Sequence, residues 1–441
     1  MSTLSRTLAT RSIARNFHGW KIARGGLVIQ MLHSGLVFNA FSLFAVELRD
    51  EFGWSSGVLG GAFALNRAES GLLGPIQGWM TDKWGSRIVL QIGAVTMALG
   101  FFWFSTIDSV IEFYLAYLLI ALGSSLSGFL TITVTLVHWF ERHRSKALAL
   151  ASLGFAVGGV LAFGVGLLIN RFGWRTTAQL AGLLALVVIL FMSRRFERRP
   201  EDIGLHVDGI DPDAAGNDDG SAPRRRVSSI HFTAAEAMRT RAFWFISLGH
   251  AFALLVVGAS MAHLAVFLRD ETDFGTLHVS LIIGTLPAMM GVGQIIGGLI
   301  GDRYDKRYIL TGAMLGHGAG LLVLAGAGSV TLIWLFVVLH GVSWGLRGPL
   351  QQALRADYFG ATDFGKIMGF SSLVIMVGMM VGPIVAGLID DATGSFRLAF
   401  ASLGVCAGAG SLWFWFATPP APPSRPAPIT TDPVADEATT R

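Results

Sequence analysis

Twelve long apolar stretches are the feature that most constrains the fold of this 441-residue chain. A helix needs about 20 mostly apolar residues to cross the ~30 Å hydrocarbon core of a membrane. Charged residues are 14% of the chain, apolar residues are 52% and the mean hydropathy is +0.58. A soluble domain could not bury this much apolar surface, so lipid must cover the part that remains. The predicted spans are residues 22–46, 56–80, 88–106, 111–138, 146–170, 174–193, 243–268, 278–301, 309–328, 330–355, 364–389 and 395–416.

The spans form two sets of six, which predicts an all-α membrane protein with twelve transmembrane helices in two six-helix halves. The predicted organisation is a cytoplasmic N-terminal tail (1–21), an N-terminal half (22–193), a flexible cytoplasmic linker (194–242), a C-terminal half (243–417) and a disordered cytoplasmic tail (418–441). Most of the 33 lysines and arginines fall on one side of these spans, whereas the other side holds only Arg49, Arg171, Arg175, Arg269 and Arg397. The positive-inside rule therefore predicts that both termini are cytoplasmic.

A motif in the first half recurs in the second. GWMTDKWGSR at Gly78–Arg87 aligns with GLIGDRYDKR at Gly298–Arg307, which pairs Asp82 with Asp302. A duplicated six-helix unit predicts two pseudo-symmetric halves, with the substrate bound between them and alternating access by rocking of one half against the other.

The repeated motif and the six-plus-six layout resemble the major facilitator superfamily over residues 20–417. Within it, FGWS (Phe52–Ser55), NRAESGLLGPIQGW (Asn66–Trp79), WFERHRSKALALASLG (Trp139–Gly154) and GPIVAGLIDDATGSF (Gly382–Phe396) resemble the monocarboxylate-porter and oxalate/formate-antiporter branch. The resemblance implies a monomeric transporter whose cytoplasmic gate includes Gly78, Asp82, Gly85, Arg87, Gly298, Asp302 and Arg307. The alternative for these residues is loop capping and topology alone.

Ionisable residues inside the spans are the strongest indication of a binding site, because each is costly in lipid unless it is paired or faces water. Members of the resembled branch place a cation in helix 8, but span 278–301 has none, so a counter-charge for an anion must lie elsewhere. Arg67 and Glu69 lie near the middle of helix 2, about 200° apart on a helix, so only one of them can face a given cavity.

Helix 10 has a polar stripe around Arg347. His340, Ser343, Trp344 and Gln351 share its helical face, and such a stripe predicts a watered cavity. We therefore predict substrate contacts from Arg67, Arg347, His33, Asn66, His340, Ser343 and Trp344. The alternatives are a structural ion pair for Arg67 and a snorkelling or gating role for Arg347.

Burial disfavours the ionised form of a carboxyl group, which makes Glu69 the predicted proton-coupling residue, with His33 as the second candidate. A static ion pair with a basic residue is the alternative for Glu69. A histidine hydrogen-bonded between helices is the alternative for His33.

These features predict a proton-coupled symporter for a small organic acid, a monocarboxylate, in the inner (cytoplasmic) membrane. Its partners would be that acid, the proton and the lipid bilayer, and it would bind no nucleic acid. The sequence has no phosphate-binding glycine loop, metal-ligand cluster or catalytic motif, so we expect no ATP-driven pump, enzyme, cofactor or metal. A uniporter, exchanger or efflux transporter for another small solute, and a sensor or receptor with a transporter fold, remain alternatives.

Overall fold

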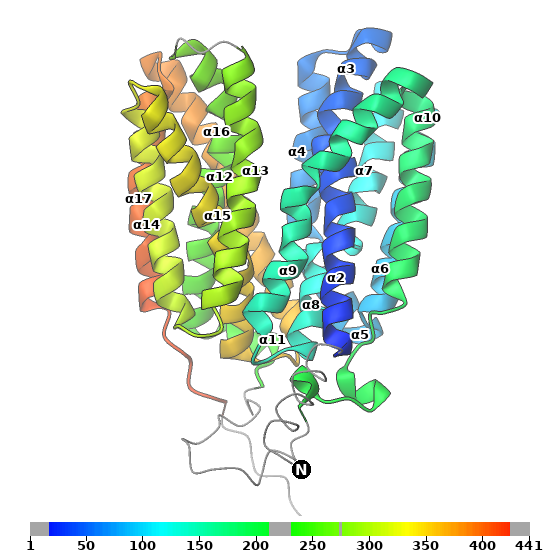
Figure 1. Cartoon of the computed structure of the whole chain (residues 1–441), viewed down its shortest axis with the longest axis vertical. Coiled ribbons are helices and arrows are strands. Elements are labelled where there is room, and N and C mark those ends of the chain that lie inside the picture. The colour runs from blue at the N-terminus through cyan, green and yellow to red at the C-terminus, as the bar shows by residue number, and fades with distance from the viewer. Residues whose placement is uncertain (1–16, 211–230, 273–275, 424–441) are drawn as a thin grey trace, which may run out of the picture.

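The computed structural model describes residues 17–210, 231–272 and 276–423, without the side chains of Ser56, Phe63, Ala64, Arg67, Thr276 and Leu277. The described chain is helical and folds into two groups of helices (Figure 1). This is the all-α membrane architecture that the sequence predicts. The N-terminal tail through residue 16, the centre of the linker and the C-terminal tail from residue 424 lie outside the described residues.

The N-terminal half contains α2 (His18–Leu32), the π-helix η1 (His33–Asn39), α3 (Phe41–Phe52), α4 (Ser56–Leu72), α5 (Gly74–Trp84), α6 (Ser86–Phe104), α7 (Val110–Leu126), α8 (Phe129–Trp139), α9 (Arg144–Val157) and α10 (Gly159–Ser193). The C-terminal half contains α12 (Arg241–Asp270), α13 (Thr276–Ile300), α14 (Lys306–Ala325), α15 (Val330–Phe359), α16 (Phe364–Thr393) and α17 (Phe396–Phe416).

Ten helical segments in the described chain are long and apolar enough to cross a membrane. The twelve predicted spans nevertheless all fall on helices. Two of them lie in the single segment Arg144–Ser193, which bends at Gly173, where φ is 76°. The predicted span 56–80 lies on α4 and α5, which meet at Leu73, so neither piece reaches full length.

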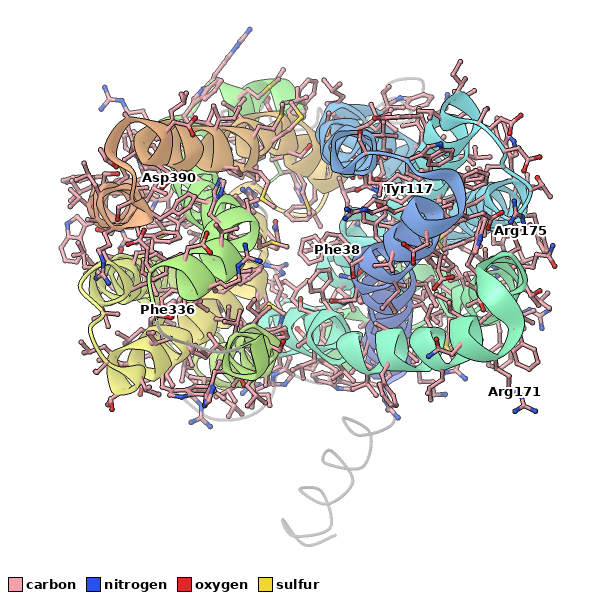
Figure 2. The ribbon with its side chains drawn as sticks, turned by 90° about the horizontal axis from the view of Figure 1, so that it is seen from above. Phe38, Tyr117, Arg171, Arg175, Phe336 and Asp390 are labelled. Carbon is pink, nitrogen blue, oxygen red and sulfur yellow. The ribbon has the colours of Figure 1, made fainter. Side chains whose placement is uncertain are left out.

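The first span is also interrupted. After α2 the backbone widens into the π-helix His33–Asn39, and π-helical turns are rare and concentrate at functional sites. The side-chain amide of Asn39 donates to the carbonyl of Ser34 at 2.7 Å, within this turn. The π-helix places Phe38 on the side of the N-terminal half that faces the other half (Figure 2).

Each half has its own apolar core, so each is packed as a unit. A third, smaller cluster joins the halves and includes Leu130, Val134 and Val137 from α8 and Phe364 and Met368 from α16. It lies at the end where α5, α8 and α11 are seen in Figure 1, and we call this the closed end. At the opposite end the two groups of helices diverge.

The ends of the predicted flexible linker are structured and bind both halves at the closed end. The 3₁₀ turns η2 (Pro200–Ile203) and η3 (Val207–Gly209) follow α10, and α11 (Ala234–Met238) precedes α12. The backbone N–H of Phe232 donates to the carbonyl of Phe359 in the C-terminal half. Short local turns and backbone hydrogen bonds therefore hold the two described ends of 194–242 in place.

Candidate functional site

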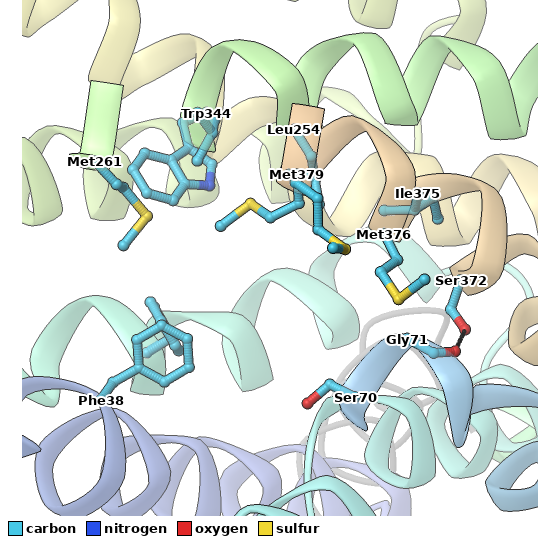
Figure 3. A pocket seen from close by; sticks show the side chains of 13 residues that line it. Phe38, Ser70, Gly71, Leu254, Met261, Trp344, Ser372, Ile375, Met376 and Met379 are labelled. Atoms are coloured by element: carbon cyan, nitrogen blue, oxygen red, sulfur yellow. Dashed lines mark hydrogen bonds between the residues drawn. The ribbon is translucent and has the colours of Figure 1, made fainter. Parts of the chain in front are cut away.

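A cavity of about 310 Å³ lies between the two halves (Figure 3). Its wall comes from η1, α4 and α9 on one side and from α12, α15 and α16 on the other. Most of the side chains in this wall are apolar. They are Phe38, Phe155, Leu254, Val257, Met261, Trp344, Ile375, Met376, Met379 and Met380, with Ser70, Gly71 and Ser372 completing the wall.

Trp344 is the one predicted substrate-binding residue, among those with a described side chain, that lines this cavity. The backbone of Arg67 lies on α4, but its side chain is outside the described set. Asn66, on the same helix, is 7% exposed and therefore buried.

Glu69 lies directly behind the cavity wall. One of its carboxylate oxygens, Oε2, accepts hydrogen bonds from Ser125 at 2.9 Å and from the cavity-lining Ser70 at 3.1 Å. The other oxygen, Oε1, is buried without a hydrogen-bond partner among the described residues. No cation pairs with Glu69 among the described side chains, a set that excludes Arg67. The cavity and the carboxyl are thus separated by one hydroxyl group.

His33 is buried between helices. Its Nε2 lies 3.0 Å from the hydroxyl of Ser127, while its Nδ1 has no partner in the described part of the chain. This contact joins η1 to the end of α7, which is the interhelical arrangement considered above as the alternative to proton transfer.

Arg347 is 1% exposed in the middle of the C-terminal half. Its Nη1 donates to the Oε1 of Gln351 at 3.2 Å, and its Nε has no partner among the described residues. None of the ion pairs found among the described residues includes Arg347. A guanidinium buried without a counter-charge is unusual, because its desolvation is left uncompensated.

Of the polar stripe of helix 10, Trp344 lines the cavity described above, and His340 and Ser343 are buried within the C-terminal half. His340 is fully buried, and its Nδ1 lies 3.2 Å from the Nδ1 of His317 on α14. Ser343 is also buried, close to the backbone of Gly316. The stripe packs against a neighbouring helix of the same half, and Trp344 at its edge reaches the cavity.

A second buried arginine was not predicted. Arg355, two turns after Arg347 on α15, is 1% exposed and donates to Gln352 at 2.7 Å and to Ser371 at 2.9 Å. Its Nη2 also lies 3.3 Å from the Nδ1 of His250. Sequence reasoning placed it at the membrane boundary, although its spacing from Arg347 puts both residues on one side of the helix.

The acidic residues and the first glycines of the predicted gate meet the opposite half at the closed end. The carboxylate of Asp82 accepts the backbone N–H groups of Gly365 and Lys366, at 3.1 and 2.9 Å, at the start of α16. Gly78, one turn earlier, leaves room for this approach, because a Cβ atom there would lie 2.0 Å from the carbonyl oxygen of Gly365.

The duplicated motif makes the corresponding contact with the N-terminal half. Asp302 accepts the backbone N–H groups of Ser145 and Lys146, at 2.8 and 3.4 Å, at the start of α9. A Cβ atom at Gly298 would lie 2.8 Å from that of Ala149. Both carboxylates therefore cap a helix N-terminus across the boundary, where a negative charge is favourable.

The basic residues of the motif pair with carboxylates close to them, Arg87 with one at the start of the linker and Arg307 with one in its own half. Arg87 lies 3.3 Å from Glu197, and Arg307 lies 2.9 Å from Asp305. Gly85 has a φ of 82° at the turn into α6, a conformation that favours glycine.

One ion pair crosses between the halves in the described structure. The Nη1 of Arg144 on α9 lies 2.6 Å from the Oδ1 of Asp357 on α15. Lys306 on α14 binds the other oxygen of the same carboxylate at 2.7 Å. The cross-half contacts of Asp82 and Asp302 also lie at the closed end. The hydrogen bond from the hydroxyl of Ser372 to the carbonyl of Gly71 crosses between the halves at the cavity wall.

Two overlapping matches to the Major Facilitator Superfamily model cover residues 27–285 and 246–436. The chain belongs to the Major Facilitator Superfamily. Members of this superfamily are multi-pass membrane transporters and not enzymes, so the chain is a secondary transporter for a small solute.

Among known relatives, human monocarboxylate transporter 11 is 24% identical over 421 residues, which cover 92% of this chain and 84% of the relative. Human monocarboxylate transporter 2 is 23% identical, and the match covers 90% of this chain and 84% of the relative. The hexuronate transporter of Bacillus subtilis (strain 168) is 22% identical, with 85% of this chain and 89% of the relative covered. The superfamily and its distant monocarboxylate-transporter relatives are thereby confirmed.

Solved structures confirm the superfamily fold. The transporter FucP in its outward conformation superposes with a TM-score of 0.70 at 15% identity, covering 91% of this chain and 99% of that one. The human organic anion transporter MFSD10 superposes with a TM-score of 0.68 at 17% identity, covering 90% of this chain and 99% of that one.

Proposed function

We propose that this superfamily member carries a small organic anion, a monocarboxylate, together with a proton by alternating access. Two sets of relatives support an anionic substrate, since they are named for transport of monocarboxylates and of hexuronate. The positive-inside pattern supports a cytoplasmic closed end, so the conformation described above would be the outward-facing state of an inner-membrane protein.

The observation that carries the proposal is the buried, unpaired guanidinium of Arg347. A substrate carboxylate would supply the missing negative charge and could accept two parallel hydrogen bonds from the guanidinium fork. Trp344 lies one helical turn away and lines the cavity, so the approach to Arg347 would pass this side chain. In this proposal Arg67 provides a second cation from α4, and Asn66, His33, His340 and Ser343 provide polar contacts as the halves move.

Glu69 is the proposed proton carrier. Ser70 connects the carboxyl group to the cavity, and the unpartnered Oε1 offers an acceptor for a proton. A proton bound there would remove the charge of a carboxylate that has no described counter-ion. Uptake of a monoanion with one proton would then be electroneutral. His33 is the second candidate, because its Nδ1 is also without a partner among the described residues.

In the proposed cycle, Asp82 and Asp302 hold the cytoplasmic gate shut in the outward-facing state, and Gly78 and Gly298 allow the close approach that these contacts need. Arg87, Arg307 and Gly85 shape the two loops. The inward-facing state requires all four cross-half N–H contacts of the two carboxylates to break.

Uptake by purified protein in liposomes tests the proposal directly. Arg347→Lys keeps the charge but removes the planar fork, and we expect substrate binding to weaken by about 1 to 3 kcal/mol. Arg67→Lys is measured in parallel, because at least one of the two should show this loss with normal folding. Transport at the wild-type rate by both variants would remove the main support for an anionic substrate.

A further inference from the structure

The walls of the cavity contain almost no group suited to a small hydrophilic acid. Four methionines, Met261, Met376, Met379 and Met380, contribute from α12 and α16. Aromatic side chains from three other helical segments also line the cavity. Among them, the ring centroids of Phe38 and Phe155 lie 5.0 Å apart in an edge-to-face arrangement. Figure 3 shows Met261, Trp344, Met379 and Met376 facing the side of the cavity that carries Phe38 and Ser70.

The two serine hydroxyls in the wall are already engaged. The hydroxyl of Ser372 donates to the carbonyls of Gly369 at 2.6 Å and Gly71 at 3.3 Å. The hydroxyl of Ser70 lies within hydrogen-bond distance of Glu69 and of Ser125. A substrate with several hydroxyl groups would lose hydrogen bonds to water in this cavity and recover few of them, which costs binding energy.

Resting on the proposed function, we infer that the transported acid has an apolar body, a straight or branched alkyl chain or an aryl ring, attached to its single carboxylate. The apolar body occupies the methionine-lined cavity, and the carboxylate points toward Arg347. A volume of about 310 Å³ is at the lower end of the range of sites that enclose drug-sized ligands, and an acid of two or three carbons would leave much of it empty.

Methionine suits this role because its unbranched thioether adapts to bodies of different shape and makes favourable contacts with aromatic rings. The methionines of α16 belong to the C-terminal half, while Phe38 and Phe155 belong to the N-terminal half. An apolar body between them contacts both halves at once, which a two- or three-carbon acid does not.

The inference predicts how affinity changes with chain length. Burying one methylene contributes about 0.8 kcal/mol, which is about a fourfold decrease in Kd. The Kd should therefore fall about fourfold per carbon from acetate through propionate and butyrate to hexanoate. Phenylacetate should bind at least as tightly as hexanoate, and lactate more weakly than butyrate.

The test measures the thermal stabilisation of the purified full-length protein by each acid, since a ligand of the folded state stabilises it by RT ln(1 + [L]/Kd). Hexanamide and phenylacetamide are included as uncharged analogues with the same bodies. Equal or tighter binding of lactate or acetate relative to hexanoate overturns the inference while leaving an anion transporter intact. Stabilisation by the amides but by no acid supports the apolar site and contradicts the anionic substrate. No stabilisation by any of these compounds overturns the inference as well.

A pair of substitutions two residues apart on α16 localises the effect. Met379 lines the cavity, whereas Val377 is 55% exposed and is not one of the residues that line it. Met379→Ala should weaken hexanoate binding about threefold to tenfold and leave acetate within twofold, while Val377→Ala should change neither. An equal effect of both variants on hexanoate would place the binding site elsewhere and overturn the inference.

Discussion

The ion pair between Arg144 and Asp357 should control how often the closed end opens. It joins α9 of one half to α15 of the other, so it exists only while the halves touch there. Lys306 binds the same carboxylate but lies in the same half as Asp357, so this second pair survives when the halves separate. Arg144→Gln should therefore favour the state in which the closed end is open, and Lys306→Gln should not.

The size of the effect follows from burial. Removing one partner of a fully buried ion pair costs roughly 3 to 5 kcal/mol, whereas an exposed pair contributes about 1 kcal/mol or less. The side chain of Arg144 is 6% exposed and that of Asp357 is 28% exposed, and Asp357 keeps Lys306. We therefore expect Arg144→Gln to shift the conformational equilibrium by about 1 to 3 kcal/mol, which corresponds to about 5- to 150-fold.

A cysteine at Val134 measures this shift. Val134 is 1% exposed in the apolar cluster that joins the halves, so a thiol there reacts only when the closed end opens. In a Cys406→Ser background, the maleimide labelling rate of Val134→Cys should rise about 5- to 150-fold with Arg144→Gln. Equal rates with Arg144→Gln and Lys306→Gln, or no change with either, would refute the assigned role of the cross-half pair.

The remaining predictions concern coupling, topology and the linker. Glu69→Gln should abolish uphill, pH-driven uptake but retain counterflow exchange, because exchange needs no net proton release; loss of both activities in a folded protein would argue against proton coupling there. Cysteines at Ser221 and Thr276 should react with an impermeant reagent from the cytoplasm and from outside, respectively, and external labelling at Ser221 in intact cells would contradict the topology. The carboxylate of Asp208 accepts three backbone N–H groups just before α9, at 2.6 to 3.3 Å, from a positive φ of 58°. Asp208→Ala should destabilise the protein by about 1 to 2 kcal/mol and raise the labelling rate of Val134→Cys, and Asp208→Asn should have a smaller effect on both. Equal thermal stability of the wild type and both variants would contradict the capping role.

Hydropathy alone was sufficient for the helical architecture, because the membrane thickness sets a minimum length for every span. It could not predict the internal interruptions. The dipeptide Gly74–Pro75 is a helix-breaking signal beside the break at Leu73, whereas the π-helix His33–Asn39 contains no proline. Both breaks lie near the cavity, since Gly71 and Phe38 are among its lining residues.

The site was only partly predictable, because helical spacing determines which side chains share a face but not which neighbour that face meets. His340 and Arg347 do share a face, yet that face packs against α14 of its own half and leaves Trp344 in the cavity. The sequence analysis did not single out the methionines, because an uncharged apolar side chain on a membrane helix does not stand out from those that pack against other helices or lipid. The spacing of Met376, Met379 and Met380 on one side of α16 is the signal that could have identified them.

Alignment of the two halves by the internal repeat shows which contacts the halves share and which they do not. Asp82 and Asp302 align with each other, and the amides that each carboxylate accepts, at Gly365 and at Ser145, also align. The contacts at the closed end are therefore two copies of one arrangement, as expected for two halves that must separate there together.

The charged groups behind the cavity follow no such symmetry. Glu69 aligns with Met289 in the second half, and Arg347 aligns with Ser127 in the first. Under the proposed function, the proton carrier and the cation for the substrate therefore lie in different halves, on either side of an apolar cavity. A proton on Glu69 and a carboxylate at Arg347 would each remove one uncompensated buried charge, so occupation of both sites would remove the desolvation cost of these two groups as the halves rock. That condition is the one a symporter needs, because a single bound ligand would leave the other charge in place.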